Sequence, residues 1–308
     1  MIVTVTVSTW NRASYLDSTL TGMRNLHVPE GIDWELLVVN NNCTDGTDEV
    51  IARHARGLPL RRLFEADQGL SNARNLAVAE ARGDLILFTD DDVVVDSGWM
   101  AAYVEAARNW PEADYFGGTI DPLFEAEPSG WIRRHLKLLS SPFGIHQFGE
   151  EIRFFRPSEA PFGANMAFRR EVLGARPFDS RLGRCGDEVV NGEETALFER
   201  LAASGVRGLW VGTARVQHRI PLDHMTEQYL YRWYRGAGRT LARCGGVSRC
   251  ERFLGLPRRV WELNYVAEPG TALLSILVAL SAASKGSLWM RAFQVSARMR
   301  GFISELRQ

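Results

Sequence analysis

Cysteine is scarce in this sequence of 308 residues, and the four cysteines, Cys43, Cys185, Cys244 and Cys250, are scattered. No Cys-x-x-Cys pair is present, so neither a zinc site nor a disulfide framework is indicated. Reduced thiols are the simplest interpretation, and we expect a cytoplasmic protein. The N-terminus has no basic region and no cleavage site around its first apolar residues, so we expect no signal peptide.

Long apolar runs and a strong excess of one charge are also missing. The longest apolar run, residues 271–283, is shorter than the roughly 20 residues of a membrane-spanning helix, which favours a buried or interfacial helix. The formal net charge of −1 gives no support for broad nucleic-acid binding, so we expect no nucleic-acid partner. With 45% hydrophobic and 24% charged residues, the composition is that of a globular chain with one large domain or two smaller ones.

Two common nucleotide-binding motifs are absent as well. No Gly-x-Gly-x-x-Gly follows the first apolar strand, which excludes the usual dinucleotide fingerprint, and no P-loop motif occurs. Instead, predicted strands alternate with predicted helices, which is typical of a parallel α/β sheet. The strands are expected at residues 2–7, 34–39, 60–64 and 85–88, and the helices between them begin near residues 15, 48 and 70.

The strand at residues 85–88 leads into three consecutive carboxylates, Asp90, Asp91 and Asp92. Adjacent carboxylates repel one another unless a cation or a donor-rich ligand compensates their charge. Because side chains alternate along a strand, we expect Asp90 and Asp92 to lean the same way. Oxygen ligands at the open end of an α/β sheet indicate a Mg²⁺ or Mn²⁺ site, which we favour over an acidic surface turn.

Polar loops follow three of the predicted strands, at residues 9–12, 40–45 and 90–92. In a parallel sheet these loops meet at one edge. Together they would offer amide and hydroxyl groups, Arg12 and a cation site, a combination that suits a nucleoside diphosphate. The asparagine run at residues 40–42 also fits plain turn chemistry, since asparagine favours turns and caps.

The second half of the chain holds candidates for acceptor binding and for catalysis. Residues 121–160 are rich in proline and aromatic residues, which suits either a sugar-stacking surface or ordinary packing. Residues 161–168 predict a strand in which Gly163 indicates close approach of a ligand or of another backbone. Glu193 and Glu194 open an amphipathic helix, either as favourable charges at a helix start or as a general base for an acceptor hydroxyl.

The remaining chain predicts two strands, residues 209–211 and 214–219, and then helices. A lone histidine such as His218 is more often structural, but as a neutral imidazole it could complete the coordination of Mn²⁺. Residues 221–308 predict basic, amphipathic helices with interleaved aromatic residues. These helices could contact an anionic membrane surface, hold part of a diphosphate, or present a solvated face, so a peripheral position on the inner membrane face is one expectation.

Five segments stand in a characteristic order: residues 7–12 (Val-Ser-Thr-Trp-Asn-Arg), 40–47, 69–75 (Gly-Leu-Ser-Asn-Ala-Arg-Asn), 88–92 and 192–194 (Gly-Glu-Glu). In this order they resemble the inverting family 2 glycosyltransferases with the A-type (GT-A) fold. The resemblance implies an α/β fold with a mixed central sheet. It also implies a Rossmann-like nucleotide-sugar-binding half at residues 1–118, an acceptor-binding and catalytic half at residues 119–220, and a helical C-terminal region at residues 221–308.

The resemblance implies roles for individual residues. Asp90 would contact the ribose side of the nucleotide, and Asp92 would bind the Mn²⁺ or Mg²⁺ that carries the donor diphosphate, with His218 as a further ligand. Glu194 takes the place of the family's catalytic base. The other residues expected to contact the nucleotide sugar are Thr9, Asn11, Arg12, Asn40, Asn42, Arg74, Asp91 and Asn165.

Two positions depart from the family's pattern. The base is commonly aspartate in a Glu-Asp pair, whereas here Glu194 follows Glu193, so either glutamate could be the base. The residue that reads a pyrimidine is commonly aspartate, whereas here it is Asn40, whose amide oxygen can still accept a hydrogen bond from a base N–H.

The expected activity is therefore inverting, metal-dependent transfer of a hexose or N-acetylhexosamine from a nucleoside-diphosphate sugar, with a UDP-sugar as the first choice. The acceptor would be a hydroxyl of a glycan, a lipid-linked molecule or a small molecule. Two alternatives remain open at this point. A nucleotidyltransferase would usually show a glycine-rich phosphate loop after the first strand, and a non-catalytic sugar-nucleotide-binding protein would need no base.

Overall fold

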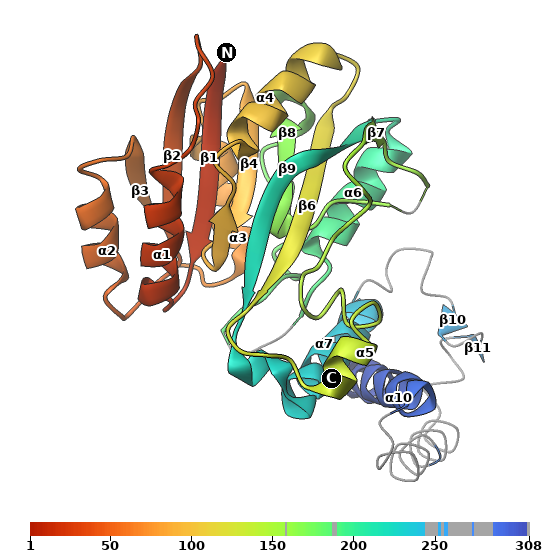
Figure 1. Ribbon diagram of the computed structural model, residues 1–308. Helices are drawn as coiled ribbons and strands as arrows, with labels where there is room; N and C mark the ends of the chain where they lie inside the picture. Colours follow the sequence, from red (N-terminus) through yellow and green to blue (C-terminus); the bar gives the residue numbers. More distant parts are fainter. Residues whose placement is uncertain are drawn as a thin grey trace. The chain divides into compact units, whose positions relative to one another are not determined.

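The computed structural model describes residues 1–157, 159–186, 190–243, 252–253, 256–257, 273 and 286–306. The chain forms two compact units, and Figure 1 colours it along the sequence. The first unit holds Met1–Leu123, Phe143–Ser180 and Glu193–Ile220, and the second holds Phe124–Pro142, Arg181–Gly192 and Pro221–Gln308. Two segments of the expected catalytic half therefore belong to the same unit as the C-terminal region.

The first unit is built on a mixed sheet that has nine strands among the described residues. Four of them are parallel, in the spatial order β3-β2-β1-β4: β1 (Ile2–Thr9), β2 (Asp33–Asn40), β3 (Leu60–Phe64) and β4 (Leu85–Asp90). The sheet continues from β4 through β8 (Met166–Arg169), β6 (Tyr115–Phe124), β9 (Gly208–Ile220) and β5 (Val93–Val95), and β7 (Ile152–Phe154) pairs with β9. The pairs β4–β8, β6–β8, β5–β9 and β7–β9 are antiparallel, so the predicted mixed α/β architecture is confirmed.

Helices cover both faces of the parallel half of the sheet (Figure 1). The valines of β1 (Val3, Val5 and Val7) face the side of α1 (Ala13–Met23), α2 (Thr47–His54) and α4 (Trp99–Asn109). Ile86 and Phe88 of β4 face the opposite side, where α3 (Leu70–Glu80) and α6 (Glu193–Ala203) pack. Strands that are buried on both faces favour apolar residues in both registers, which explains the apolar runs of β2 and β4, whereas β1 buries threonines on its second face.

Two predicted strand bounds are wrong. Residues 209–211 and 214–219, predicted as separate strands, belong to the single strand β9. Gly212 lies within β9 and does not end it. A glycine stands there because another backbone passes close by: a Cβ on Gly212 would lie 2.3 Å from the carbonyl oxygen of Gly149. The strand predicted at residues 161–168 begins later, because Gly163–Asn165 form a 3₁₀ turn that leads into β8. A second 3₁₀ turn, Arg170–Val172, follows β8.

Asn165 is a structural centre of this unit and is completely buried. Its Nδ2 donates to the carbonyl oxygens of Thr119 and Ala214, at 2.9 and 2.8 Å. Its Oδ1 accepts hydrogen bonds from Trp99 Nε1 and Tyr103 Oη, each at 2.7 Å. A side-chain amide has two donor and two acceptor positions, so every position of Asn165 is used to join β6, β9 and α4.

The second unit contains α5 (Gly130–Arg134), a 3₁₀ turn at Leu222–Met225, α7 (Glu227–Arg243), the short strands β10 (Arg252–Phe253) and β11 (Leu256–Pro257), and α10 (Ser287–Leu306). The backbones of α7 and α10 approach closely at two glycines. A Cβ on Gly238 would lie 1.9 Å from the carbonyl oxygen of Arg298, and one on Gly301 would lie 1.8 Å from that of Arg235. Any larger residue at either glycine would force the two helices apart.

The aromatic residues that the sequence offered as membrane anchors are mostly packed inside the second unit. Trp289, Phe293 and Phe302 of α10 are only 1%, 7% and 1% exposed. The described part of α7 and α10 keeps several exposed arginines, namely Arg232, Arg235, Arg291 and Arg300. Contact with an anionic membrane surface therefore stays a prediction, and it now depends on charge rather than on these aromatic residues.

Nothing among the described helices is both long enough and apolar enough to cross a bilayer. The apolar run at residues 271–283, apart from Leu273, lies outside the described residues. The arginines Arg249, Arg258 and Arg259 of the basic segment also lie outside them.

Replacing Asn165 with alanine is expected to lower the free energy of unfolding by at least about 2 kcal/mol, because four hydrogen bonds of buried polar groups would be lost. Denaturant unfolding measures this loss. The matched control is Asn109→Ala at the exposed end of α4, which should change stability by no more than about 0.5 kcal/mol. Equal stabilities for the two variants would contradict the structural role of Asn165.

Candidate active site

Three strand ends bring the predicted polar loops to one edge of the sheet. In the parallel register, Thr9 of β1 lies opposite Asn40 of β2, and Ser8 lies opposite Asp90 of β4. The loops that follow these three strands therefore begin at the same edge, as the sequence predicts. The antiparallel pairing of β5 with β9 adds His218 to this edge, because His218 lies opposite Val93 in the register.

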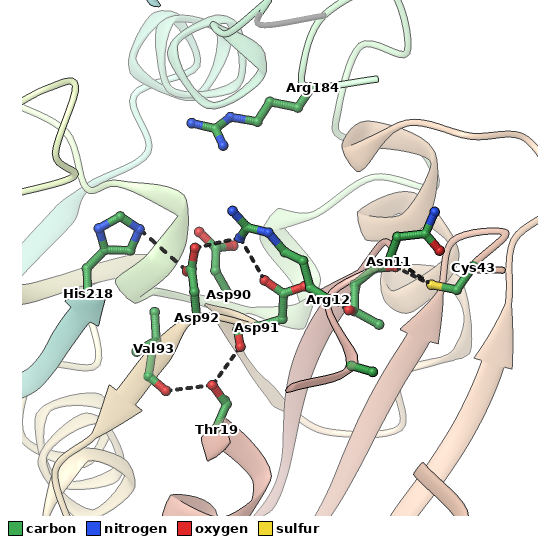
Figure 2. Close-up of polar contacts among 12 residues, drawn as sticks. Asn11, Arg12, Thr19, Cys43, Asp90, Asp91, Asp92, Val93, Arg184 and His218 are labelled. Atoms are coloured by element: carbon green, nitrogen blue, oxygen red, sulfur yellow. Dashed lines mark hydrogen bonds and ion pairs between the residues drawn. The ribbon is translucent and has the colours of Figure 1, made fainter. Parts of the chain in front are cut away.

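Arg12 links the two aspartates that follow the end of β4. Its Nη1 donates to Oδ1 of Asp91 at 3.1 Å and to Oδ2 of Asp92 at 2.6 Å, as Figure 2 shows. Thr9 donates from Oγ1 to the other carboxylate oxygen of Asp91 at 2.7 Å. The predicted residues Thr9, Arg12, Asp91 and Asp92 thus form one hydrogen-bonded cluster.

Burial and neighbouring charges act against each other on these two aspartates. Burial raises the pKa of Asp91 to about 6, and the attraction of Arg12 only partly offsets it. Burial also opposes the charge of Asp92. The attraction of His218 and Arg12 outweighs it and holds the pKa of Asp92 well below its ordinary value. Asp92 is therefore the aspartate that keeps its negative charge over the whole neutral range.

His218 is held with one ring nitrogen facing Asp92. Its Nδ1 lies 2.8 Å from the carbonyl oxygen of Phe143, which can only accept, so Nδ1 carries a hydrogen. The other nitrogen, Nε2, lies 3.4 Å from Oδ1 of Asp92 (Figure 2). Within the described part of the chain, this oxygen of Asp92 is buried and accepts no hydrogen bond.

Asp92 and His218 fit a divalent cation. Against the effect of burial, Asp92 raises the pKa of His218, so without a metal the two form an ion pair, and a divalent cation would take the place of the proton on Nε2. The histidine donates its other N–H to a backbone carbonyl, as metal-ligating histidines commonly do. Among the described residues, however, no group of three His, Cys, Asp or Glu side chains could hold a metal. The protein would therefore supply two ligands, and phosphate oxygens and water would have to supply the others.

Arg74 of α3 gathers three other carboxylates and is itself only 3% exposed. Its Nη1 donates to Oε1 of Glu193 at 3.1 Å and to Oε1 of Glu194 at 2.9 Å, and its Nη2 donates to Oδ1 of Asp90 at 3.3 Å. Asp90 and Asp92 bind different arginines, but Asp90 lies near enough to Asp92 and His218 for their charges to act on its pKa. β4 ends at Asp90, so the alternation of side chains ends there too.

The two glutamates at the start of α6 differ in their surroundings. The side chain of Glu193 is 5% exposed and that of Glu194 is 24% exposed. Burial, together with repulsion from Glu194, raises the pKa of Glu193 to about 8. Glu193 is therefore mainly a neutral acid at pH 7, whereas Glu194 is the more accessible of the two.

Asn40 and Asn165, both predicted to contact a nucleotide, use their amides inside the protein. Asn40 is buried, donates from Nδ2 to Asp48 Oδ1 at 2.7 Å and accepts from the backbone N–H of Cys43 at 2.8 Å. Asn165 has no unused hydrogen-bonding position, as described above. Asn165 therefore offers no free position to a ligand. Asn40 uses one N–H and its oxygen within the protein, and its contact with a nucleotide stays a prediction.

Asn11 and Asn42 lie in the loops after β1 and β2. Both are exposed and have positive φ values, +51° and +61°, which asparagine adopts more readily than most residues. Asn11 Oδ1 accepts from the backbone N–H of Thr44 at 2.7 Å and so joins the two loops. Both asparagines remain at the edge where a ligand would enter.

Two residues that shape the site were missed in the sequence. Thr19 of α1 donates to the carbonyl oxygens of Asp91 and Val93, each at 2.8 Å, and so fixes the turn between β4 and β5. Asn41 accepts from Gly69 N–H at 2.8 Å and thereby ties the loop after β2 to the start of α3. The only available signals were a threonine on the apolar side of a helix and the middle position of an asparagine run.

Comparison with known proteins places these features in context. The chain matches the family model for glycosyl transferase family 2 over residues 4–175. The succinoglycan biosynthesis protein ExoM of Rhizobium meliloti is 24% identical over 298 residues, which cover 94% of this chain and 89% of that protein. The glucosyl-dolichyl phosphate glucuronosyltransferase of Haloferax volcanii is 28% identical over 171 residues, which cover 53% of this chain and 51% of the relative, so the chain matches about half of its length.

Among the solved structures that resemble the whole chain are two with a bound nucleotide sugar. The mannosyltransferase PcManGT of Pyrobaculum calidifontis, in complex with GDP-Man and Mn²⁺, has a TM-score of 0.61 at 18% identity and covers 99% of this chain and 86% of that one. TarS 1-349 of S. aureus, in complex with UDP-GlcNAc, has a TM-score of 0.57 at 16% identity and covers 100% and 90%. At this level of identity, the likeness concerns the fold.

The high pKa of Glu193 predicts a pH-dependent stability. The groups that face Glu193 are Glu194, Arg74 and Asp90. Because its folded-state pKa of about 8 is above the ordinary 4.5, the folded protein keeps a proton that the unfolded chain loses between these values. Its stabilising contribution is full at low pH and is lost as the pH rises through about 8.

Glu193→Gln imitates the neutral acid and should remove this dependence. Between pH 6 and 8, the free energy of unfolding of the wild type should fall relative to that of the variant, by up to roughly 1.4 kcal/mol per pH unit. Urea unfolding of both proteins at four pH values measures the difference, from which all other titrating groups largely cancel. A difference that is independent of pH would show that Glu193 is ionised in the folded protein.

Proposed function

Since the chain belongs to glycosyl transferase family 2, we propose that it transfers a sugar with inversion from a nucleoside diphosphate to an acceptor hydroxyl, with Glu194 as the general base. The observation that supports this proposal most is the place of Glu194. Its partly exposed carboxylate is tied through Arg74 to Asp90, at the strand edge where the donor is expected.

The chain is a family 2 glycosyltransferase with the GT-A fold, so the resemblance inferred from its motifs is confirmed. Enzymes of this class use nucleotide-sugar donors. A nucleotidyltransferase and a non-catalytic binding protein, the alternatives considered from sequence, find no support in the family match.

We place the donor diphosphate beside Asp92, His218 and Arg12. Asp92 and His218 would hold Mn²⁺ or Mg²⁺, which when bound would offset the negative charge that develops on the leaving diphosphate. Arg12 adds a guanidinium at the same place, and guanidinium groups bind phosphate oxygens well. The Mn²⁺ in the mannosyltransferase structure supports this choice of ion for the fold.

Glu194 would act on the acceptor. As the acceptor oxygen forms its bond to the anomeric carbon, the bond from that carbon to the diphosphate oxygen breaks, and the hydroxyl proton passes to Glu194. A single displacement from the face opposite the leaving group inverts the anomeric carbon, and it needs no carboxylate as a covalent nucleophile. Glu193 is unsuited to this step near neutral pH, because a neutral acid has no charge with which to accept the proton.

Glu194→Gln is expected to lower turnover by about 100-fold to 10,000-fold, the usual contribution of a general base, while donor binding persists. Donor hydrolysis and transfer in the presence of Mn²⁺, over a panel of nucleotide sugars, provide the measurement. The control is Glu105→Gln on the exposed side of α4, which should leave turnover unchanged. Full activity of the Glu194 variant would remove this residue from the role of base.

Asp92→Asn is expected to weaken Mn²⁺-dependent binding of UDP or GDP by about 10-fold or more, because the site loses its charged ligand. Thermal shift with each nucleotide, with and without Mn²⁺, reports this binding, since ligands that bind the native state raise its apparent stability. The same panel tests our preference for a UDP-sugar as donor. Asp33→Asn, at the exposed opposite end of β2, is the control, and an unchanged metal-dependent shift in the Asp92 variant would contradict the metal assignment.

A further inference from the structure

The guanidinium of Arg74 is fixed from several sides. Beyond its three carboxylate partners, it lies 5.6 Å from the centroid of the Phe178 ring. Phe178 is itself held in place by Asn75, which donates from Nδ2 to its carbonyl oxygen at 2.8 Å and accepts from its backbone N–H at 3.0 Å. A side chain that is buried and bounded in this way has little freedom to follow a ligand.

Gly163 leaves the space that Arg74 and Glu194 occupy. A Cβ on Gly163 would lie 2.1 Å from Oε1 of Glu194 and 2.2 Å from Nη2 of Arg74. The two charged groups therefore pack directly against the backbone of the turn that precedes β8. The sequence predicted the close approach of a ligand or of another backbone at this glycine, whereas the approaching groups are the side chains of Glu194 and Arg74.

We propose that Arg74 is a positioning residue that acts through Glu194, and that Gly163 provides the room for it; this inference rests on the proposed function of Glu194 as base. The expectation from the family resemblance was different, since it placed Arg74 among the residues that contact the nucleotide. The guanidinium of Arg74 binds both Asp90 and Glu194, and it thereby fixes the distance between the end of β4 and the start of α6. Arg74 thereby holds the proposed base, Glu194, at a fixed position relative to Asp90, where the donor is expected.

Positioning of this kind has a distinct kinetic consequence. A displacement of about 1 Å in a catalytic group can cost about 100-fold in rate. The nucleotide would keep the contacts of its diphosphate with Asp92 and Arg12, which pair with each other and not with Arg74. A residue that contacts the nucleotide would instead change its affinity. Measuring both kcat and the Kd of the nucleotide therefore shows whether Arg74 positions Glu194 or contacts the nucleotide.

The experiment uses two variants that disturb the Arg74–Glu194 pair in independent ways. Arg74→Lys keeps the positive charge but cannot bridge three carboxylates with the geometry of a planar guanidinium. Gly163→Ala keeps every charge and displaces the pair. The control is Gly174→Ala, because a Cβ there meets nothing within 4 Å and the residue has no positive φ.

Both disturbing variants should lower kcat by about 10-fold to 100-fold. The Kd of UDP and of GDP with Mn²⁺, measured by titration calorimetry, should change by less than about 3-fold, whereas Gly174→Ala should match the wild type in both. A Kd raised 10-fold or more with kcat unchanged would return Arg74 to the nucleotide site. If one variant is unfolded at the assay temperature, as thermal unfolding will show, the other decides.

The inference and the proposed function fail in different ways. If the wild type neither hydrolyses nor transfers any nucleotide sugar, or if Glu194→Gln is fully active, the proposed function fails. If the wild type is active and Glu194→Gln is not, but Arg74→Lys and Gly163→Ala both behave as the wild type, only the positioning role of Arg74 is overturned.

Discussion

The arrangement of the candidate site depends on one buried guanidinium, that of Arg74, with three carboxylates within 3.3 Å of its nitrogens. Burying an ion pair costs the hydration free energy of both groups, and their mutual attraction offsets only part of this cost. A buried ion pair is therefore weak evidence for stability. Breaking such a pair is nevertheless costly, at about 3–5 kcal/mol, because a buried charge is left without compensation. The cluster is thus better understood as a device that fixes the start of α6 against the end of β4 than as a source of stability.

Three consecutive aspartates pose a charge problem that the fold solves by dividing them between two arginines. Asp90 turns to Arg74, whereas Asp91 and Asp92 turn to Arg12. The excess of negative charge around Arg74 is reduced further, because burial keeps Glu193 largely protonated near neutral pH. Asp92 and Glu194, which we propose for the metal and for the base, are therefore left in separate clusters at the same edge of the sheet.

The alternation of apolar strands and amphipathic helices predicts the parallel half of the fold, because two-sided burial of β2 and β4 requires continuous apolar runs. It also predicts which loops share an edge, since the carboxyl ends of parallel strands lie together. The contacts of Arg74 with Glu193 and Glu194 could not be predicted. These glutamates follow Arg74 by 119 and 120 positions in the sequence, and only the packing of α3 near α6 brings them together. For the same reason, Asn165 looked like a ligand-binding residue, although its partners are an indole and a phenol on α4 and two distant carbonyls. Only burial, which the sequence does not give, distinguishes Glu193 from Glu194.

The central claim is that the aspartate edge holds the donor while Glu194 faces the carbon that is attacked. A crystal structure of the protein with Mn²⁺ and an unreactive analogue of a nucleotide sugar tests this claim most directly. We expect the ion between Asp92, His218 and the diphosphate, and the Glu194 carboxylate on the side of the anomeric carbon opposite the leaving group. A nucleotide bound away from Asp92, or a Glu194 carboxylate remote from the anomeric carbon, would contradict the account.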